Sequence, residues 1–148
     1  METDARPRRT PRAALALAGA AVLALALAGC SDDKETMATW TAKGGQEQTK
    51  VIAGDIQELI RISGTGDAAK CRQLLDHVKT ARAFRKLPDQ DAQQSWEETL
   101  NRMETAINSC VQNPSGPGAG PKLSEAAEAE KAYRSFLIRI DVLTKTGS

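Results

Sequence analysis

Residues 89–113 read DQDAQQSWEETLNRMETAINSCVQN, and this stretch decides the fold class. Apolar residues recur in it at intervals of three or four positions, which is the spacing of one face of an α-helix. The residues of this stripe are Ala92, Trp96, Leu100, Met103, Ile107 and Cys110. We therefore expect a long amphipathic helix that begins at Asp89 or Gln90 and ends at Asn113-Pro114, because the residue before a proline is disfavoured in the helical conformation.

Two stretches before this one also have helical periodicity. The first has apolar residues at helical spacing between Val51 and Ile60. An extension back toward Met37 and Trp40 must cross Gly44-Gly45, where we expect a break, because each glycine weakens a helix by about 1 kcal/mol. The second runs from about Asp67, a good N-cap, to about Lys86. Its apolar side comprises Cys71, Leu74, Leu75, Val78, Ala81 and Arg82, with Phe84 near the end.

The last helical stretch runs from about Ser124 to about Thr144, after a Gly/Pro linker at 114–121. Its expected stripe is Ala126, Ala127, Tyr133, Leu137, Ile140 and Leu143, flanked by Phe136. No stretch alternates apolar and polar residues as a half-buried strand would. The sequence therefore predicts an all-α fold, an antiparallel bundle of three to four helices in residues 37–148.

The N-terminal region has the layout of a secretory signal. Four arginines at positions 6, 8, 9 and 12 precede an apolar run from Ala13 to Gly29, which ends in Leu27-Ala28-Gly29-Cys30. These last four residues resemble the lipobox of bacterial lipoproteins. The resemblance implies that residues 1–29 are a signal peptide cleaved between Gly29 and Cys30. It also implies that Cys30 carries diacylglyceryl (with fatty acids such as palmitate) and anchors the chain on the extracytoplasmic side of the cell membrane.

Alternative interpretations of this region remain open. An uncleaved membrane-spanning helix would have only 17 apolar residues, at the short edge of the span of about 17–25 residues that a bilayer needs. The pair Arg8-Arg9 allows twin-arginine export as well as the general secretory route. After the lipidated cysteine, residues 30–36 are short and polar, and we expect them to act as a tether that keeps the domain close to the lipid headgroups.

Charge and cysteine content narrow the function. The signal peptide holds four of the 20 basic and two of the 19 acidic residues, so the mature chain has a net charge of about −1, which disfavours nucleic-acid binding. With Cys30 lipidated, Cys71 and Cys110 remain. Outside the membrane such a pair is most simply a disulfide. The two cysteines fall within about three residues of facing positions in an antiparallel hairpin that turns near Leu87-Pro88, so this bond is geometrically feasible.

Nothing in the sequence marks a catalytic or metal centre. His77 is the only histidine, and we expect it at the edge of an apolar side. The carboxylates of the last two helices fall mostly on solvated faces: Glu97, Glu98, Glu104, Glu125, Glu128 and Glu130. Motifs for phosphate binding, serine hydrolysis and zinc proteolysis are missing. We therefore predict no catalytic residue, no metal ligand and no cofactor.

The expected function is that of a non-enzymatic, membrane-anchored module. Its expected partners are membrane lipid, through the acyl chains on Cys30, and an envelope or secreted protein. We expect an exposed groove, with the last helix as the element that contacts the partner. The alternative is a small-ligand carrier or sensor with a pocket between helices. An enzyme would need buried carboxylates grouped with His77.

Overall fold

The computed structural model describes residues 35–116 and 118–146. The expected signal peptide and the expected lipidation residue, Cys30, lie outside the described residues. Within them the chain forms helices and no strand, so the prediction of an all-α fold is confirmed. The elements are α1 (Met37–Trp40), the π-helical turn η1 (Thr41–Gly45), α2 (Gln46–Arg61), α3 (Ala68–Ala83), α4 (Gln90–Gln112) and α5 (Leu123–Thr146).

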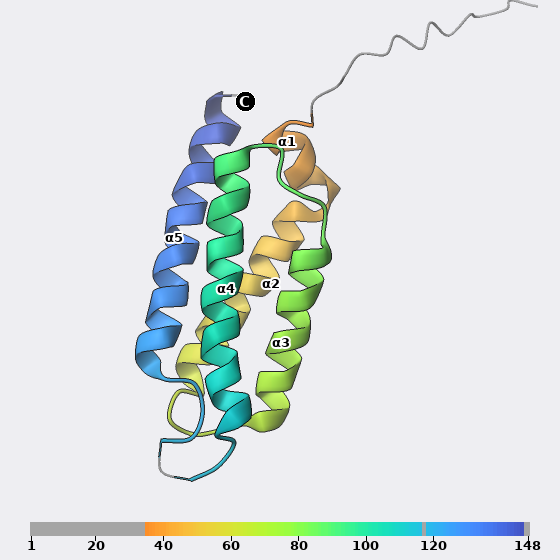
Figure 1. Cartoon of the computed structure of the whole chain (residues 1–148). Helices are drawn as coiled ribbons and strands as arrows, with labels where there is room; N and C mark the ends of the chain where they lie inside the picture. Colours follow the sequence, from red (N-terminus) through yellow and green to blue (C-terminus); the bar gives the residue numbers. More distant parts are fainter. Residues whose placement is uncertain (1–34, 117, 147–148) are drawn as a thin grey trace, which may run out of the picture. The chain divides into compact units, whose positions relative to one another are not determined.

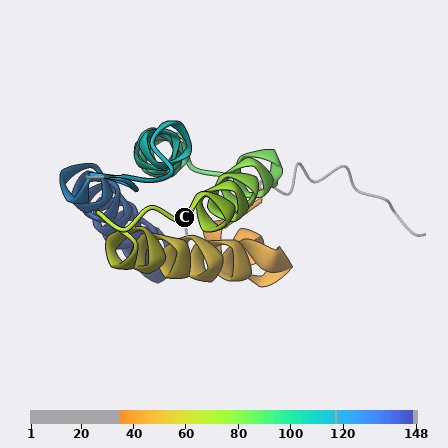
Figure 2. The ribbon, with the colours of Figure 1, turned by 90° about the horizontal axis from the view of Figure 1, so that it is seen from below.

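The four long helices form an antiparallel bundle. Successive helices run in opposite directions along it, with the short α1 at one end (Figure 1). Seen along its axis, α2, α3, α4 and α5 surround a single core (Figure 2). Each helix packs against two neighbours, and the pairs are α2–α3, α3–α4, α4–α5 and α2–α5.

The apolar stripe of α4 lies in this core, as the sequence predicts. Its six residues are at most 3% exposed, and Leu100, Met103 and Ile107 are completely buried. The helix begins where expected, because the carboxylate of Asp89 accepts a hydrogen bond from the backbone N–H of Ala92 at 2.7 Å. Truncating one fully buried leucine to alanine typically costs about 2–5 kcal/mol, so burial of the whole stripe is a dominant contribution to stability.

The expected break at Gly44-Gly45 separates α1 from α2. Gly44 has a φ of +108°, which side chains other than glycine rarely adopt. A Cβ at Gly45 would lie 2.2 Å from the Trp40 ring, so this close approach also requires glycine. The Trp40 indole is 1% exposed and donates a hydrogen bond to the Arg85 carbonyl at 3.1 Å. It meets the Phe84 ring edge-on, with 5.9 Å between the ring centroids.

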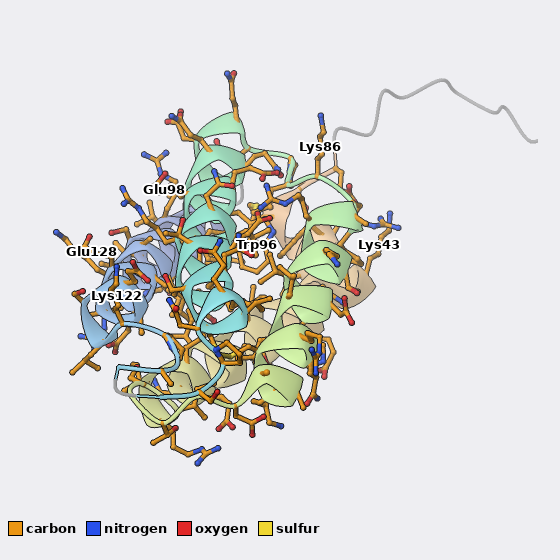
Figure 3. The ribbon with its side chains drawn as sticks, turned by 60° about the horizontal axis from the view of Figure 1, so that its bottom comes forward. Lys43, Lys86, Trp96, Glu98, Lys122 and Glu128 are labelled. Atoms are coloured by element: carbon orange, nitrogen blue, oxygen red, sulfur yellow. A yellow bond between two sulfur atoms is a disulfide. The ribbon has the colours of Figure 1, made fainter. Side chains whose placement is uncertain are left out.

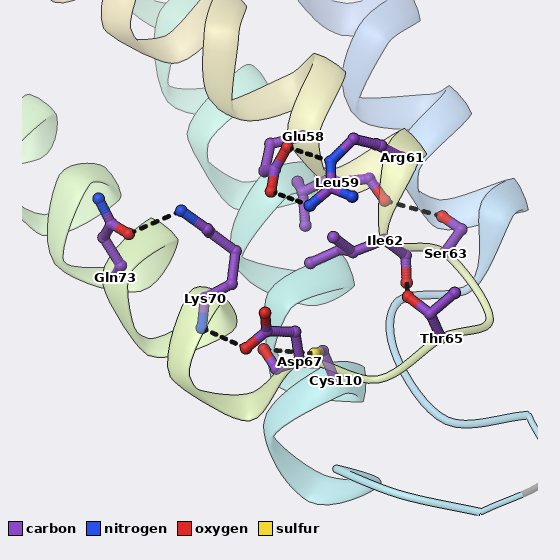
Figure 4. Close-up of polar contacts among 10 residues, drawn as sticks. All are labelled: Glu58, Leu59, Arg61, Ile62, Ser63, Thr65, Asp67, Lys70, Gln73 and Cys110. Atoms are coloured by element: carbon purple, nitrogen blue, oxygen red, sulfur yellow. Dashed lines mark hydrogen bonds and ion pairs between the residues drawn. The ribbon is translucent and has the colours of Figure 1, made fainter.

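Helix α3 is capped as expected but ends earlier. The Asp67 carboxylate accepts a hydrogen bond from the Lys70 backbone N–H at 2.9 Å, beside the polar contacts that close the α2–α3 turn (Figure 4). The helix stops at Ala83, three residues before the predicted end at Lys86. Arg82, which the sequence places on the apolar side, is exposed instead. Its long side chain extends to solvent and pairs with carboxylates on α4.

A disulfide links Cys71 of α3 to Cys110 of α4, as predicted. The two Cα atoms are 6.2 Å apart, and both residues are fully buried. The Cys110 sulfur, which has no hydrogen in the disulfide, lies 3.8 Å from the Asp67 carbonyl oxygen (Figure 4). The covalent link therefore lies near the start of α3 and the end of α4.

The stripe predicted for α5 is partly wrong. Ala127 and Leu137 are exposed, whereas Phe136, expected only to flank the stripe, is completely buried. The Phe136 ring lies 4.8 Å from the Trp96 ring, centroid to centroid. Aromatic rings bury more area than the other side chains available here, so this contact decides which face of α5 turns inward. The buried residues of the helix are Ala126, Ala129, Tyr133 and Phe136.

The Gly/Pro linker is not loose along its whole length. Ala119, Gly120 and Pro121 are buried. A Cβ at Gly120 would lie 2.8 Å from the Ile62 carbonyl oxygen and 2.8 Å from the Gly66 nitrogen, so the linker packs tightly against the α2–α3 turn. This region and the α2–α3 turn form what we call the distal end of the bundle (62–67 and 113–122).

The opposite end of the bundle receives the chain from the expected tether. The Glu35 carboxylate pairs with the Arg85 guanidinium at 2.8 Å, and Thr36 caps α1. The C-terminal part of α5 lies at this end too, because Arg139 pairs with Asp91 at 2.8 Å near the start of α4 (Figure 1). We call this the tether end; it comprises 35–45, the α3–α4 connection (84–89) and the last two turns of α5.

Replacing Cys71 and Cys110 with alanine should lower the free energy of unfolding by about 4 kcal/mol. The bond joins residues 39 positions apart, and closing a loop of that length removes entropy from the unfolded chain. Urea unfolding of both proteins would measure the difference, with reduced wild type as the control. An equal midpoint for oxidised and reduced wild type would contradict the prediction.

Candidate functional site

A groove runs along the outer surface between α4 and α5. Its middle section is a hollow of about 450 Å³. Small side chains open it, because Ser95 on α4 and Ala132 and Ser135 on α5 leave space where larger residues would close the seam between the helices. The lining of this section is Gln94, Ser95, Glu98, Arg102, Glu128, Lys131, Ala132 and Ser135.

Two further hollows continue the groove in both directions. Toward the tether end, a hollow of about 550 Å³ shares Ser95 and Ser135 with the middle section. Its remaining lining is Ile138, Arg139, Val142 and Leu143. Toward the distal end, a hollow of about 140 Å³ shares Arg102 and Glu128 and adds Thr105, Ser124 and Glu125. The lining thus changes from largely apolar at the tether end to charged and polar along the rest.

Charged side chains of both signs border the middle of the groove. Glu98 of α4 and Glu128 of α5 lie on the same side of the bundle (Figure 3). The Arg102 guanidinium donates a hydrogen bond to the Glu98 carboxylate at 2.6 Å, and this bond raises the pKa of Arg102. Both partners are about half exposed, so solvent screens the pair and it remains available to a partner's charges.

Most carboxylates singled out from the sequence serve helix packing instead. Glu97 and Glu104 both pair with Arg82, at 3.2 and 2.8 Å, and so bridge α3 to α4. Glu125 accepts a hydrogen bond from the Ser109 hydroxyl at 2.6 Å and bridges α4 to α5. Glu130 pairs with Arg134 one turn along α5. Among the expected solvated carboxylates, only Glu98, Glu125 and Glu128 line the groove.

His77 lies at the edge of the apolar side of α3, as expected, and has a partner that the sequence does not reveal. Its Nδ1 is 2.9 Å from Oδ2 of Asp55 on α2. Asp55 is only 7% exposed, and this burial raises the pKa of its carboxyl while the hydrogen bond to His77 opposes the rise. The pair joins two helices. Among the described residues, no group of three His, Cys, Asp or Glu side chains is placed to hold a metal ion.

Sequence reasoning missed the exposed apolar residues of α5. Ile138 is 69% exposed and Val142 is 54% exposed, and both line the groove at the tether end. A signal for them exists, since the apolar residues at 137, 138, 140, 142 and 143 extend over more than one face of a helix. A helix at the surface of a bundle cannot bury all of them, so some had to be exposed.

Comparisons with protein families, curated proteins and solved structures find no match to this chain. Within 35–116 and 118–146, no helix is both long and apolar enough to cross a membrane. Function is therefore argued from the residues and geometry of this chain alone.

Replacing Asp55 with asparagine should change how stability depends on pH. The raised pKa of Asp55 means that ionisation is harder in the folded state than in the unfolded state. Its stabilising contribution is therefore complete below its ordinary pKa of 3.8 and is lost as pH rises through the raised value. From about pH 3 to about pH 5, wild-type stability should fall relative to that of Asp55→Asn.

Urea unfolding of both proteins across this range would measure the difference. Asp76→Asn is a matched control, because Asp76 is exposed on α3. A constant difference between wild type and Asp55→Asn across the range would contradict the prediction.

Proposed function

We propose that this protein is a lipid-anchored extracytoplasmic lipoprotein whose helical bundle binds an envelope or secreted protein without catalysing a reaction. The anchor is diacylglyceryl on Cys30, attached at Leu27-Ala28-Gly29-Cys30. Two acyl chains bind a bilayer durably, whereas a single myristoyl chain does so only marginally. The disulfide between Cys71 and Cys110 supports the same compartment, because such bonds persist outside the reducing cytoplasm.

The observation that carries the binding function is the groove between α4 and α5. It runs through three adjoining hollows along the two longest helices. A long shallow groove between helices suits an amphipathic helix of a partner protein, whose side chains enter successive hollows. The mixed charges at Glu98, Arg102, Glu128 and Lys131 can select the partner and fix its direction.

The same geometry favours a protein partner over a small ligand. Small-molecule sites usually enclose most of the ligand surface in a concave, largely apolar pocket. The groove is open to solvent along its length, and its middle section is bordered by charges. The interior between the helices is filled by buried side chains, among them Trp40, Leu100, Met103 and Phe136.

Replacing Cys30 with serine should leave an uncleaved and unlipidated precursor, because the thiol is the acceptor of the diacylglyceryl group. Intact-mass measurement of protein extracted from native membranes with detergent would detect it. Wild type should begin at Cys30 with diacylglyceryl added. It should be about two daltons lighter before reduction than after, because a disulfide lacks two hydrogens. A mature Cys30→Ser protein of unchanged size in the membrane fraction would contradict the anchor.

Replacing Ser135 with tryptophan should weaken partner binding by about tenfold or more, equivalent to at least about 1.4 kcal/mol. Ser135 is exposed and lines two of the three hollows, so the indole would fill the groove without entering the core. Crosslinking in native membranes, with quantification of the adduct, would measure the effect.

Thr80→Trp provides a matched control, since Thr80 is exposed on α3, away from the groove. It should leave the adduct unchanged, and both variants should keep the wild-type melting temperature. Equal adduct yields from Ser135→Trp and wild type would remove the groove from the proposal.

A further inference from the structure

The expected tether limits which part of the bundle can reach the membrane. Five residue steps separate Cys30 from Glu35, the first described residue. Whatever its conformation, a chain of that length spans at most about 18 Å. Glu35 is held at the tether end by Arg85 at 2.8 Å and by Lys43 at 3.5 Å. With a lipid on Cys30, the tether end must therefore lie close to the bilayer.

The distal end cannot be equally close when the bundle stands on its tether end. Helix α5 has 24 residues, which corresponds to about 36 Å at 1.5 Å per residue. It runs from the distal end to the tether end (Figure 1). The anchor therefore makes the two ends of one helix experience different surroundings, with lipid near its C-terminal turns and water around its N-terminal turns.

Exposed apolar side chains lie on those C-terminal turns. Ile138 and Val142 are four positions apart and so share one face of α5. Val142 precedes the end of the helix at Thr146 by four residues, or about 6 Å along the axis. Lys145 follows on nearly the same face, and a lysine beside apolar residues can extend its ammonium group to phosphates while its methylenes remain apolar.

The groove lining follows the same direction. Ile138 and Val142 line it at the tether end, and Glu98, Arg102 and Glu128 line it further away. Charged groups are costly to desolvate and belong in water. An apolar surface next to the anchor and a charged surface away from it is the polarity expected of a bundle that rests on a membrane.

We propose that Ile138 and Val142 insert into the headgroup region of the membrane that holds Cys30 and thereby fix the orientation of the bundle. This inference rests on the proposed lipid anchor. Two aliphatic side chains are far from filling a stable protein interface, which buries about 1,600 Å² in total. They suffice for contact with lipid because the anchor already supplies a high local concentration of bilayer. The charged middle of the groove then faces the solvent, where a partner can enter.

Site-specific fluorescence quenching tests this contact. The lipidated protein is purified in detergent and reconstituted into phosphatidylcholine–phosphatidylglycerol vesicles. With Cys30 acylated and Cys71 bonded to Cys110, a cysteine introduced by Val142→Cys is the single free thiol for an environment-sensitive fluorophore. Val111→Cys gives the matched control, because Val111 is an exposed apolar residue of α4 next to the distal end.

We expect a headgroup-attached nitroxide lipid to quench the label at position 142 several-fold more than the label at 111. Adding Ile138→Asp should lower the quenching at 142 toward the value at 111, because a carboxylate opposes insertion. Leu123→Asp is the control for this change, since Leu123 is 61% exposed and begins α5 near the distal end. It should leave the quenching at 142 unchanged.

Other outcomes would overturn the inference in distinguishable ways. Co-flotation of the protein with vesicles, with equal nitroxide quenching at 142 and 111, would leave the anchor intact and reject the membrane contact. Shielding of the label at 142 from both the nitroxide lipid and aqueous iodide would mean that protein, such as a second copy of the chain, covers the site. A protein without diacylglyceryl, which does not co-float, would reject the anchor and this inference together.

Discussion

The burial of one side of α4 is the constraint on which the rest of the structure depends. Helix α4 packs against both α3 and α5, so its stripe supplies a surface that the other helices must cover. Trp96 receives Phe136 of α5, and Cys110 is bonded to Cys71 of α3. The position of α3 is thus fixed covalently, and the rotation of α5 is fixed by ring packing.

The sequence predicts the helices better than it predicts their rotations. Strict three-to-four spacing identifies α4, and Asp67 and Asp89 mark two helix starts through the hydrogen bonds that their carboxylates accept. The inward face of α5 could not be chosen from spacing alone, because apolar residues surround much of its C-terminal half. Only the position of Trp96 on another helix shows that Phe136, and not Leu137, turns inward.

The same limit applies to the candidate site. A groove depends on which small residues of two helices face each other, and Ser95 and Ser135 are 40 positions apart in the sequence. The partner of His77 is likewise hidden, since Asp55 reaches it from α2 across the packed helices. The disulfide was predictable because two cysteines outside the expected anchor leave a single pairing, and because a tight turn places them near each other.

The packing of the linker before α5 has a consequence for the oligomeric state. Exchange of a terminal helix between two copies of a chain requires a hinge that can straighten without loss of contacts. Ala119, Gly120 and Pro121 are buried against the α2–α3 turn, and the Gly120 N–H donates a hydrogen bond to the Asn113 carbonyl at 3.1 Å. Straightening this hinge would expose these residues and break that hydrogen bond. The close contact of Gly120 with the α2–α3 turn therefore protects the protein against domain swapping of α5.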